Sequence, residues 1–137
     1  LLHAFGLDRL MGILSPFIRR ARLKTNDESH IWTVASLMVT ATGIIFIHSA
    51  EIWLWAFLYV YLDISSIPDF ETALYFSTVS LSTVGCGDVV VSSHYRILGA
   101  MEAASGMILF GWSTAFLFEV LALTYARLNF RKMSEDR

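Results

Sequence analysis

The sequence predicts an all-α membrane protein in which two membrane-spanning helices flank a shorter helix that enters the membrane without crossing it. The first observation is composition, because 55% of the 137 residues are hydrophobic and only 16% are charged. Such a chain is either an unusually apolar domain or a small membrane protein. The second is the charge distribution, because all of the ten Lys and Arg residues except Arg96 lie within residues 9–24 or 127–137. The third is a short apolar segment, residues 69–82, that ends beside glycines.

The first span is expected at residues 31–62. Within it, Glu51 is the only acidic residue and His48 is the only histidine. As a helix this stretch would extend about 48 Å, longer than a bilayer core of about 30 Å, so it must tilt, break or project. His48 and Glu51 share a helix face, but two ligands are too few for a metal site, and neighbouring Trp53 and Trp55 indicate an interfacial belt. A proton-sensing role for His48 stays open.

The second span is expected at residues 95–126, which are apolar except for Arg96, Glu102 and Glu119. Carboxylates inside a membrane are costly, so both acidic residues invite a functional interpretation, although pairing between subunits is the simpler use. Small residues allow close helix packing in lipid. In this span they are Gly99, Ala100, Ala103, Ala104, Ser105, Gly106 and Gly111.

The basic flanks, residues 9–24 and 127–137, precede the first span and follow the second. The positive-inside rule therefore places both on the cytoplasmic side and the loop between the spans outside. An acidic outer mouth would raise the local cation concentration, although each carboxylate could simply be solvated. The acidic residues of this loop are Asp63, Asp69, Glu71 and Asp88.

Residues 69–82 form the predicted short helix. Ser66 or Asp69 can cap its N-terminus, and Pro68 suits a first turn. Residues 70–82 would extend about 20 Å as a helix, which is too short to cross the bilayer core. A helix that ends within a membrane must be buried in protein or line water, because its free backbone groups cannot face lipid. We therefore expect a re-entrant helix.

The sequence "TVGCGD" follows this helix. Gly85 and Gly87 can adopt positive φ without steric cost, so alternate residues of an extended segment can turn their carbonyl groups the same way. Carbonyl oxygens of Thr83, Val84, Gly85 and Cys86 could then replace the water around a cation. One copy cannot surround an ion, whereas four copies around an axis can. A homotetramer with C4 symmetry is therefore the expected assembly.

"TVGCGD" resembles the "TVGYGD" selectivity filter of tetrameric potassium channels, and the order of elements matches their two-span pore module. The resemblance extends over residues 31–125, and "ETALYFSTVSLSTVGCGD" with "RILGAMEAASGMILFGWSTAF" is similar to small bacterial potassium channels. It implies passive, potassium-selective conduction with K⁺ as the permeant ion, no cofactor, and a place in the bacterial inner membrane. The implied filter is residues 83–88, with K⁺ bound at Thr83, Val84, Gly85 and Cys86, Gly87 completing the filter, and Asp88 at the outer mouth.

Cys86 stands where the family usually has tyrosine. The family's tyrosine ring braces the filter against aromatic residues of the pore helix, here Tyr75 and Phe76, and a thiol is too small to do so. The resemblance therefore implies a less rigid outer filter and weaker discrimination against sodium. The alternative is that neighbouring side chains fill the gap and selectivity survives. As the only cysteine, Cys86 cannot form an intrachain disulfide.

The resemblance also assigns roles within the second span. Gly106 falls at the family's gating hinge, and the low helix propensity of glycine gives a physical reason for bending there. The alternative is a glycine that serves only helix packing. Thr114 and Phe118 fall on the face that would line the inner cavity and its gate, where Phe rings could close a pore by dewetting. Ordinary helix packing is the alternative for both.

Residues 1–25 are expected to form an amphipathic helix on the inner membrane surface, or else the end of a longer helix. Residues 26–126 would form the pore domain and residues 127–137 a short cytoplasmic tail. The apolar positions of the N-terminal helix are Leu10, Ile13, Leu14, Phe17 and Ile18, followed by a basic cluster.

Two other functions remain open. A non-selective monovalent cation channel would share this architecture, and a non-conducting membrane subunit or scaffold would explain the spans but not "TVGCGD". An enzyme is not expected, because the sequence offers no nucleophile with a placed base, no metal-ligand cluster and no phosphate-binding loop. The expected partners are other copies of the chain and the lipid bilayer, not nucleic acid or a small-molecule substrate.

Overall fold

The computed structural model describes residues 1–23, 27–62, 64 and 66–135, with side chains described for all of these except 22, 27–29 and 125–135. These described residues form four α-helices and one 3₁₀ turn joined by loops, and they contain no strand. Two helical stretches, His30–Tyr61 and Ser93–Thr124, are long and apolar enough to cross a membrane. The predicted all-α class with two spans is therefore confirmed. The elements are α1 (Leu2–Leu23), α2 (Asp27–Tyr61), α3 (Phe70–Leu81), η1 (Ser93–Tyr95) and α4 (Arg96–Glu135).

The long helices extend beyond the stretches expected to cross the membrane. α2 begins at Asp27, upstream of the expected span, and α4 continues to Glu135. The predicted tail, residues 127–137, is thus helical as far as the structure describes it. The sequence between Tyr125 and Glu135 contains no Gly or Pro that would end a helix.

The chain divides into two compact units. One comprises residues 1–47 and 113–137, and the other comprises residues 48–112. α2 and α4 are each divided between the units, with one segment of each helix in either unit.

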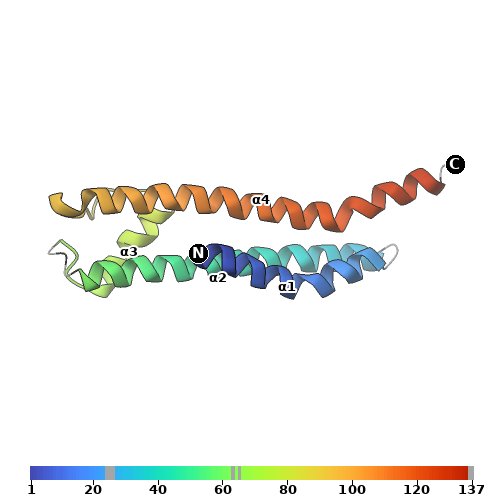
Figure 1. Cartoon of the computed structure of the whole chain (residues 1–137), viewed down its shortest axis with the longest axis horizontal. Helices are drawn as coiled ribbons and strands as arrows, with labels where there is room; N and C mark the ends of the chain where they lie inside the picture. Colours follow the sequence, from blue (N-terminus) through green and yellow to red (C-terminus); the bar gives the residue numbers. More distant parts are fainter. Residues whose placement is uncertain (24–26, 63, 65, 136–137) are drawn as a thin grey trace. The chain divides into compact units, whose positions relative to one another are not determined.

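In the first unit, α1 lies along the first half of α2 (Figure 1). A Cβ atom at Gly6 would lie 2.9 Å from Ile47 Cδ1, so the two helices are in close contact. The buried positions of α1 recur at intervals of three or four residues and include Leu10, Leu14 and Ile18, which pack with Val120 of α4. Ile13, expected on the same apolar face, is 58% exposed and lies outside this core. Contact of α1 with a membrane surface stays a prediction.

In the second unit, α3 packs against the second half of α2 and the first half of α4. Figure 1 shows α3 between these two helices. The Tyr59 ring meets the Phe76 ring edge-on, with centroids 5.2 Å apart at an interplanar angle of 86°. The buried core consists of Ala56, Tyr59, Ile64, Ile67, Ala73, Phe76 and Val91.

Asp69 caps the N-terminus of α3. Its Oδ1 accepts a hydrogen bond from the backbone N–H of Thr72 at 2.8 Å, and this bond lowers the pKa of the Asp69 carboxyl. Because the helix begins at Phe70, Pro68 precedes the cap, and the prediction that it lies in the first turn is wrong. Ser66, the other candidate cap, instead accepts a hydrogen bond from the backbone N–H of Ser92 at 3.1 Å, which joins the two loops around α3.

Candidate functional site

The segment after α3 is held by the last turn of that helix. The N–H groups of Ser82 and Thr83 donate to the carbonyls of Thr78 and Ser80, at 3.1 and 2.9 Å. The Gly85 N–H reaches further back and donates to the Val79 carbonyl at 3.0 Å. These bonds fold the first half of residues 83–88, the filter segment, against the C-terminus of α3. Its position therefore depends directly on the position of that helix.

Every second residue from Thr83 to Gly87 has a positive φ. The angles are 61° at Thr83, 55° at Gly85 and 79° at Gly87. Both glycines were expected to adopt positive φ, and this is confirmed. At Thr83 the same conformation is strained, because a β-branched residue is rarely left-handed. The sequence alone does not predict this strained conformation. The Thr83 N–H donates to the Ser80 carbonyl, and this hydrogen bond stabilises it.

The filter segment lies on the surface of the single chain. Val84 is 66% exposed and the free thiol of Cys86 is also exposed. A Cβ atom added at Gly85 or Gly87 would meet no atom within 4 Å. Within the described residues of one chain, this segment is therefore open on one side and does not enclose an ion.

Tyr75 joins α3 to the far end of the filter segment. Its hydroxyl donates to Asp88 Oδ2 at 2.8 Å and also interacts with the Cys86 thiol. The bond to Asp88, followed by the Cys86 interaction, raises the pKa of Tyr75 to about 12. The same hydroxyl lowers the pKa of Asp88. The family resemblance predicts Tyr75 behind the filter as an aromatic brace, but it does not predict the bond to Asp88.

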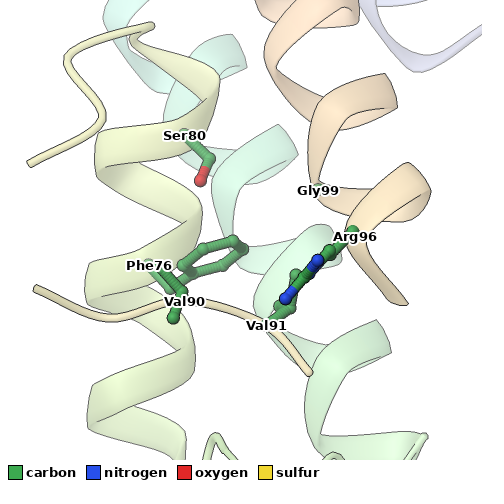
Figure 2. Close-up of a pocket in the computed structure, with 6 residues that line it drawn as sticks. All are labelled: Phe76, Ser80, Val90, Val91, Arg96 and Gly99. Atoms are coloured by element: carbon green, nitrogen blue, oxygen red, sulfur yellow. The ribbon is translucent and has the colours of Figure 1, made fainter. Parts of the chain in front are cut away.

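Phe76, the other expected filter support, points into the helical core. Its side chain is only 7% exposed and contacts the Tyr59 ring. It also lines a cavity of about 460 Å³ that is bordered by Arg96 at the start of α4 (Figure 2). The structure thus brings Tyr75, but not Phe76, to the Cys86 and Asp88 side chains. The remaining residues around the cavity are Ser80, Val90, Val91 and Gly99.

Gly106 lies in close contact with the end of α3. A Cβ atom at this position would overlap the carbonyl oxygen of Leu81 and lie 2.8 Å from its carbonyl carbon. Leu81 is the last residue of α3, immediately before the filter segment. Gly106 is therefore a packing glycine, whereas its role as a hinge stays a prediction.

Comparison with known proteins adds one match. A family model described as an ion channel matches residues 33–122, more than half of the chain. The chain belongs to this ion-channel family. No curated protein and no solved structure matched. The match includes α3, the filter segment and the two apolar helical stretches, so the protein is a membrane protein with ion-channel activity.

Thr114 and Phe118, expected to line the inner cavity and gate of this ion channel, lie on the part of α4 that belongs to the first unit. Both are exposed and, four residues apart, they share a helix face. Glu119 is also exposed, unlike Glu102. The roles of Thr114 and Phe118 in a gate stay predictions.

His48 and Glu51 form a buried pair within α2. His48 Nδ1 lies 3.0 Å from Glu51 Oε2, as their shared helix face predicts. The imidazole also stacks on the Phe110 ring, with centroids 4.3 Å apart. The spacing of three residues along one helix thus accounts for the pairing. A proton-sensing role for His48 stays a prediction.

Proposed function

We propose that the protein is a homotetrameric channel that conducts potassium passively, with backbone carbonyls of residues 83–86 as ligands. The observation that carries this proposal is the alternation of positive φ at Thr83, Gly85 and Gly87 directly after α3. Alternation of this kind lets successive carbonyls face one side, and such rings of carbonyls can replace the hydration shell of a cation. The negative end of the α3 dipole lies beside the same segment, which favours a cation there.

The open side of the filter segment supports assembly of four copies. One chain supplies one row of carbonyls, whereas a cation needs oxygens on all sides. Cyclic symmetry meets this need with one type of contact repeated around an axis. In the same proposal Thr114 and Phe118 line the inner part of the pore, and Gly106 is its gating hinge. The basic flanks face the cytoplasm. The resemblance to small bacterial channels supports a location in the inner membrane.

Selectivity for potassium over sodium depends on how the filter segment is held. The hydrogen bond from Tyr75 to Asp88 ties its outer end to α3, which supports selectivity despite the loss of the family's tyrosine. The second candidate function is a non-selective monovalent cation channel. It is favoured by the small, exposed side chain of Cys86, which supplies no aromatic packing.

Purified protein in liposomes tests the proposal. Native mass spectrometry should give a tetramer, and an imposed potassium gradient should drive flux that protein-free liposomes lack. Reversal potentials in opposed potassium and sodium solutions should show a preference for potassium. Equal permeabilities would instead establish the non-selective channel. A monomer or dimer without flux would overturn both and favour a non-conducting subunit.

A further inference from the structure

A buried polar cluster joins α2, α3 and α4 and has no part in the ion-binding role proposed above. It consists of Tyr59 on α2, Ser77 on α3 and Glu102 on α4, each with 0% of its surface exposed. The Tyr59 hydroxyl donates to Glu102 Oε2 at 2.7 Å. One carboxyl group therefore lies where three helices meet.

Two polar atoms of the cluster have no hydrogen-bond partner in the residues that the structure describes. Glu102 Oε1 and Ser77 Oγ have no hydrogen-bond partner of standard geometry among the described residues. The Ser77 hydroxyl nevertheless lies near the Glu102 carboxyl. Tyr59 from α2 is the only titratable group that acts on this carboxyl within the described part of the chain, and no cation does.

The protonation state follows from these contacts. A buried carboxylate without a cation costs at least several kcal/mol, because no water solvates it. A neutral carboxylic acid can accept from Tyr59 at Oε2 and donate from Oε1 to Ser77 Oγ. An ionised carboxylate could accept from the same two hydroxyls, but only the neutral form places no charge inside the membrane.

Glu102 also lies on a stretch of α4 that packs closely against α3. Gly99 and Gly106 flank it on the same helix face, three residues before and four after. A Cβ atom at Gly99 would lie 3.3 Å from Phe76 Cζ, and one at Gly106 would overlap the Leu81 carbonyl oxygen. Contacts on both sides of Glu102 therefore fix α3, whose last turn holds the filter segment.

We propose that Glu102 is a positioning residue that, as a neutral carboxylic acid, joins α2, α3 and α4 and thereby fixes the filter segment. The effect on conduction rests on the proposed channel function. The effect on filter position does not, because it can be measured at Cys86. As the only cysteine in the chain, Cys86 can be labelled specifically.

The experiment compares Glu102→Gln, Glu102→Ala and Tyr59→Phe in liposomes, with Glu119→Gln as the matched control from the exposed face of α4. Infrared spectra of the wild type at neutral pH should contain the carbonyl band of a protonated carboxylic acid. Glu102→Gln should remove this band and Tyr59→Phe should shift it, whereas Glu119→Gln should leave it unchanged. Glu102→Gln should also retain potassium flux and the wild-type rate of Cys86 labelling by an impermeant maleimide. Glu102→Ala should reduce flux and change the labelling rate several-fold.

Absence of the carboxylic-acid band in the wild type would overturn the proposal, because Glu102 would then be ionised. Loss of flux in a tetrameric Glu102→Gln variant would also overturn it, because the charge would then be needed. Equal Cys86 labelling in the Gln and Ala variants would show that Glu102 does not position the filter segment. If the wild type lacks flux but shows the band and the expected labelling difference, the channel function fails while the positioning role stands.

Discussion

The filter segment and the packed face between α3 and α4 are close in sequence, yet different interactions hold them. The filter segment is determined by its backbone: three positive φ angles, hydrogen bonds to the last turn of α3, and largely exposed side chains. The packed face is determined by side chains and by close helix approach, with Glu102 buried between Gly99 and Gly106. One chain completes the packed face, whereas in the proposed channel the open filter segment is completed by further copies of the chain.

This difference predicts two classes of variant. Changes on the packed face should impair folding and conduction together. Changes in the filter segment should impair conduction or selectivity and leave folding intact. Four substitutions test this separation, each with a measurement that could contradict it.

Gly106→Ala should have the largest effect. The new methyl group would overlap the Leu81 carbonyl oxygen, and a backbone atom cannot rotate away as a side chain can. Overpacking of this kind costs about 1–3 kcal/mol, so the variant should show a lower melting temperature and little potassium flux. Gly111→Ala on the same helix is the control, because its Cβ would meet nothing within 4 Å. Wild-type stability and flux in Gly106→Ala would show that α3 and α4 are not packed as described.

Gly85→Ala should abolish flux but preserve the fold. Nothing lies within 4 Å of a Cβ at this position, so the effect comes from the φ of 55° alone. A left-handed residue other than glycine costs about 1–2 kcal/mol, which disfavours the conformation in which the carbonyls face one side. Helix content and tetramer mass should match the wild type. Unchanged conductance would mean that ions do not pass through the filter segment.

Tyr75→Phe should have an intermediate effect that depends on external pH. In the wild type, the Tyr75 hydroxyl bonds the ionised Asp88 and holds its pKa below the ordinary value of 3.8. The stabilisation from this bond is present above the ordinary pKa and is lost as pH falls through the lowered pKa. Without the donor, Asp88 should be protonated at a higher pH.

Flux through Tyr75→Phe should therefore be several-fold lower than flux through the wild type. When the external solution is acidified, flux through the variant should begin to decline at a higher pH than flux through the wild type. Tyr61→Phe is the matched control, because Tyr61 is 84% exposed. If the two variants have the same pH profile, the bond between Tyr75 and Asp88 does not stabilise the outer filter segment.

The same comparison explains how much of the molecule the sequence could predict. The Asp69 cap, the short helix after it and the positive φ of Gly85 and Gly87 all follow from local chemistry, and the structure contains each of them. The hydrogen bonds from Tyr75 to Asp88 and from Tyr59 to Glu102 join residues 13 and 43 positions apart. Such pairs depend on how the helices pack, so residue spacing alone could not identify them.

Cys86→Tyr should have the smallest effect, because it adds packing to a segment that Tyr75 already holds at Asp88. If the outer filter is loose, a phenol ring at position 86 should pack beside Tyr75 and raise the potassium-to-sodium permeability ratio several-fold. Tetramer mass and melting temperature should not change, because the packed face is untouched. Cys86→Ser is the control for loss of the thiol without added bulk, and its permeability ratio should equal that of the wild type. A wild type that is already strictly selective, or a ratio unchanged by tyrosine, would mean that the bond between Tyr75 and Asp88 is a sufficient brace and that Cys86 is a tolerated packing variant.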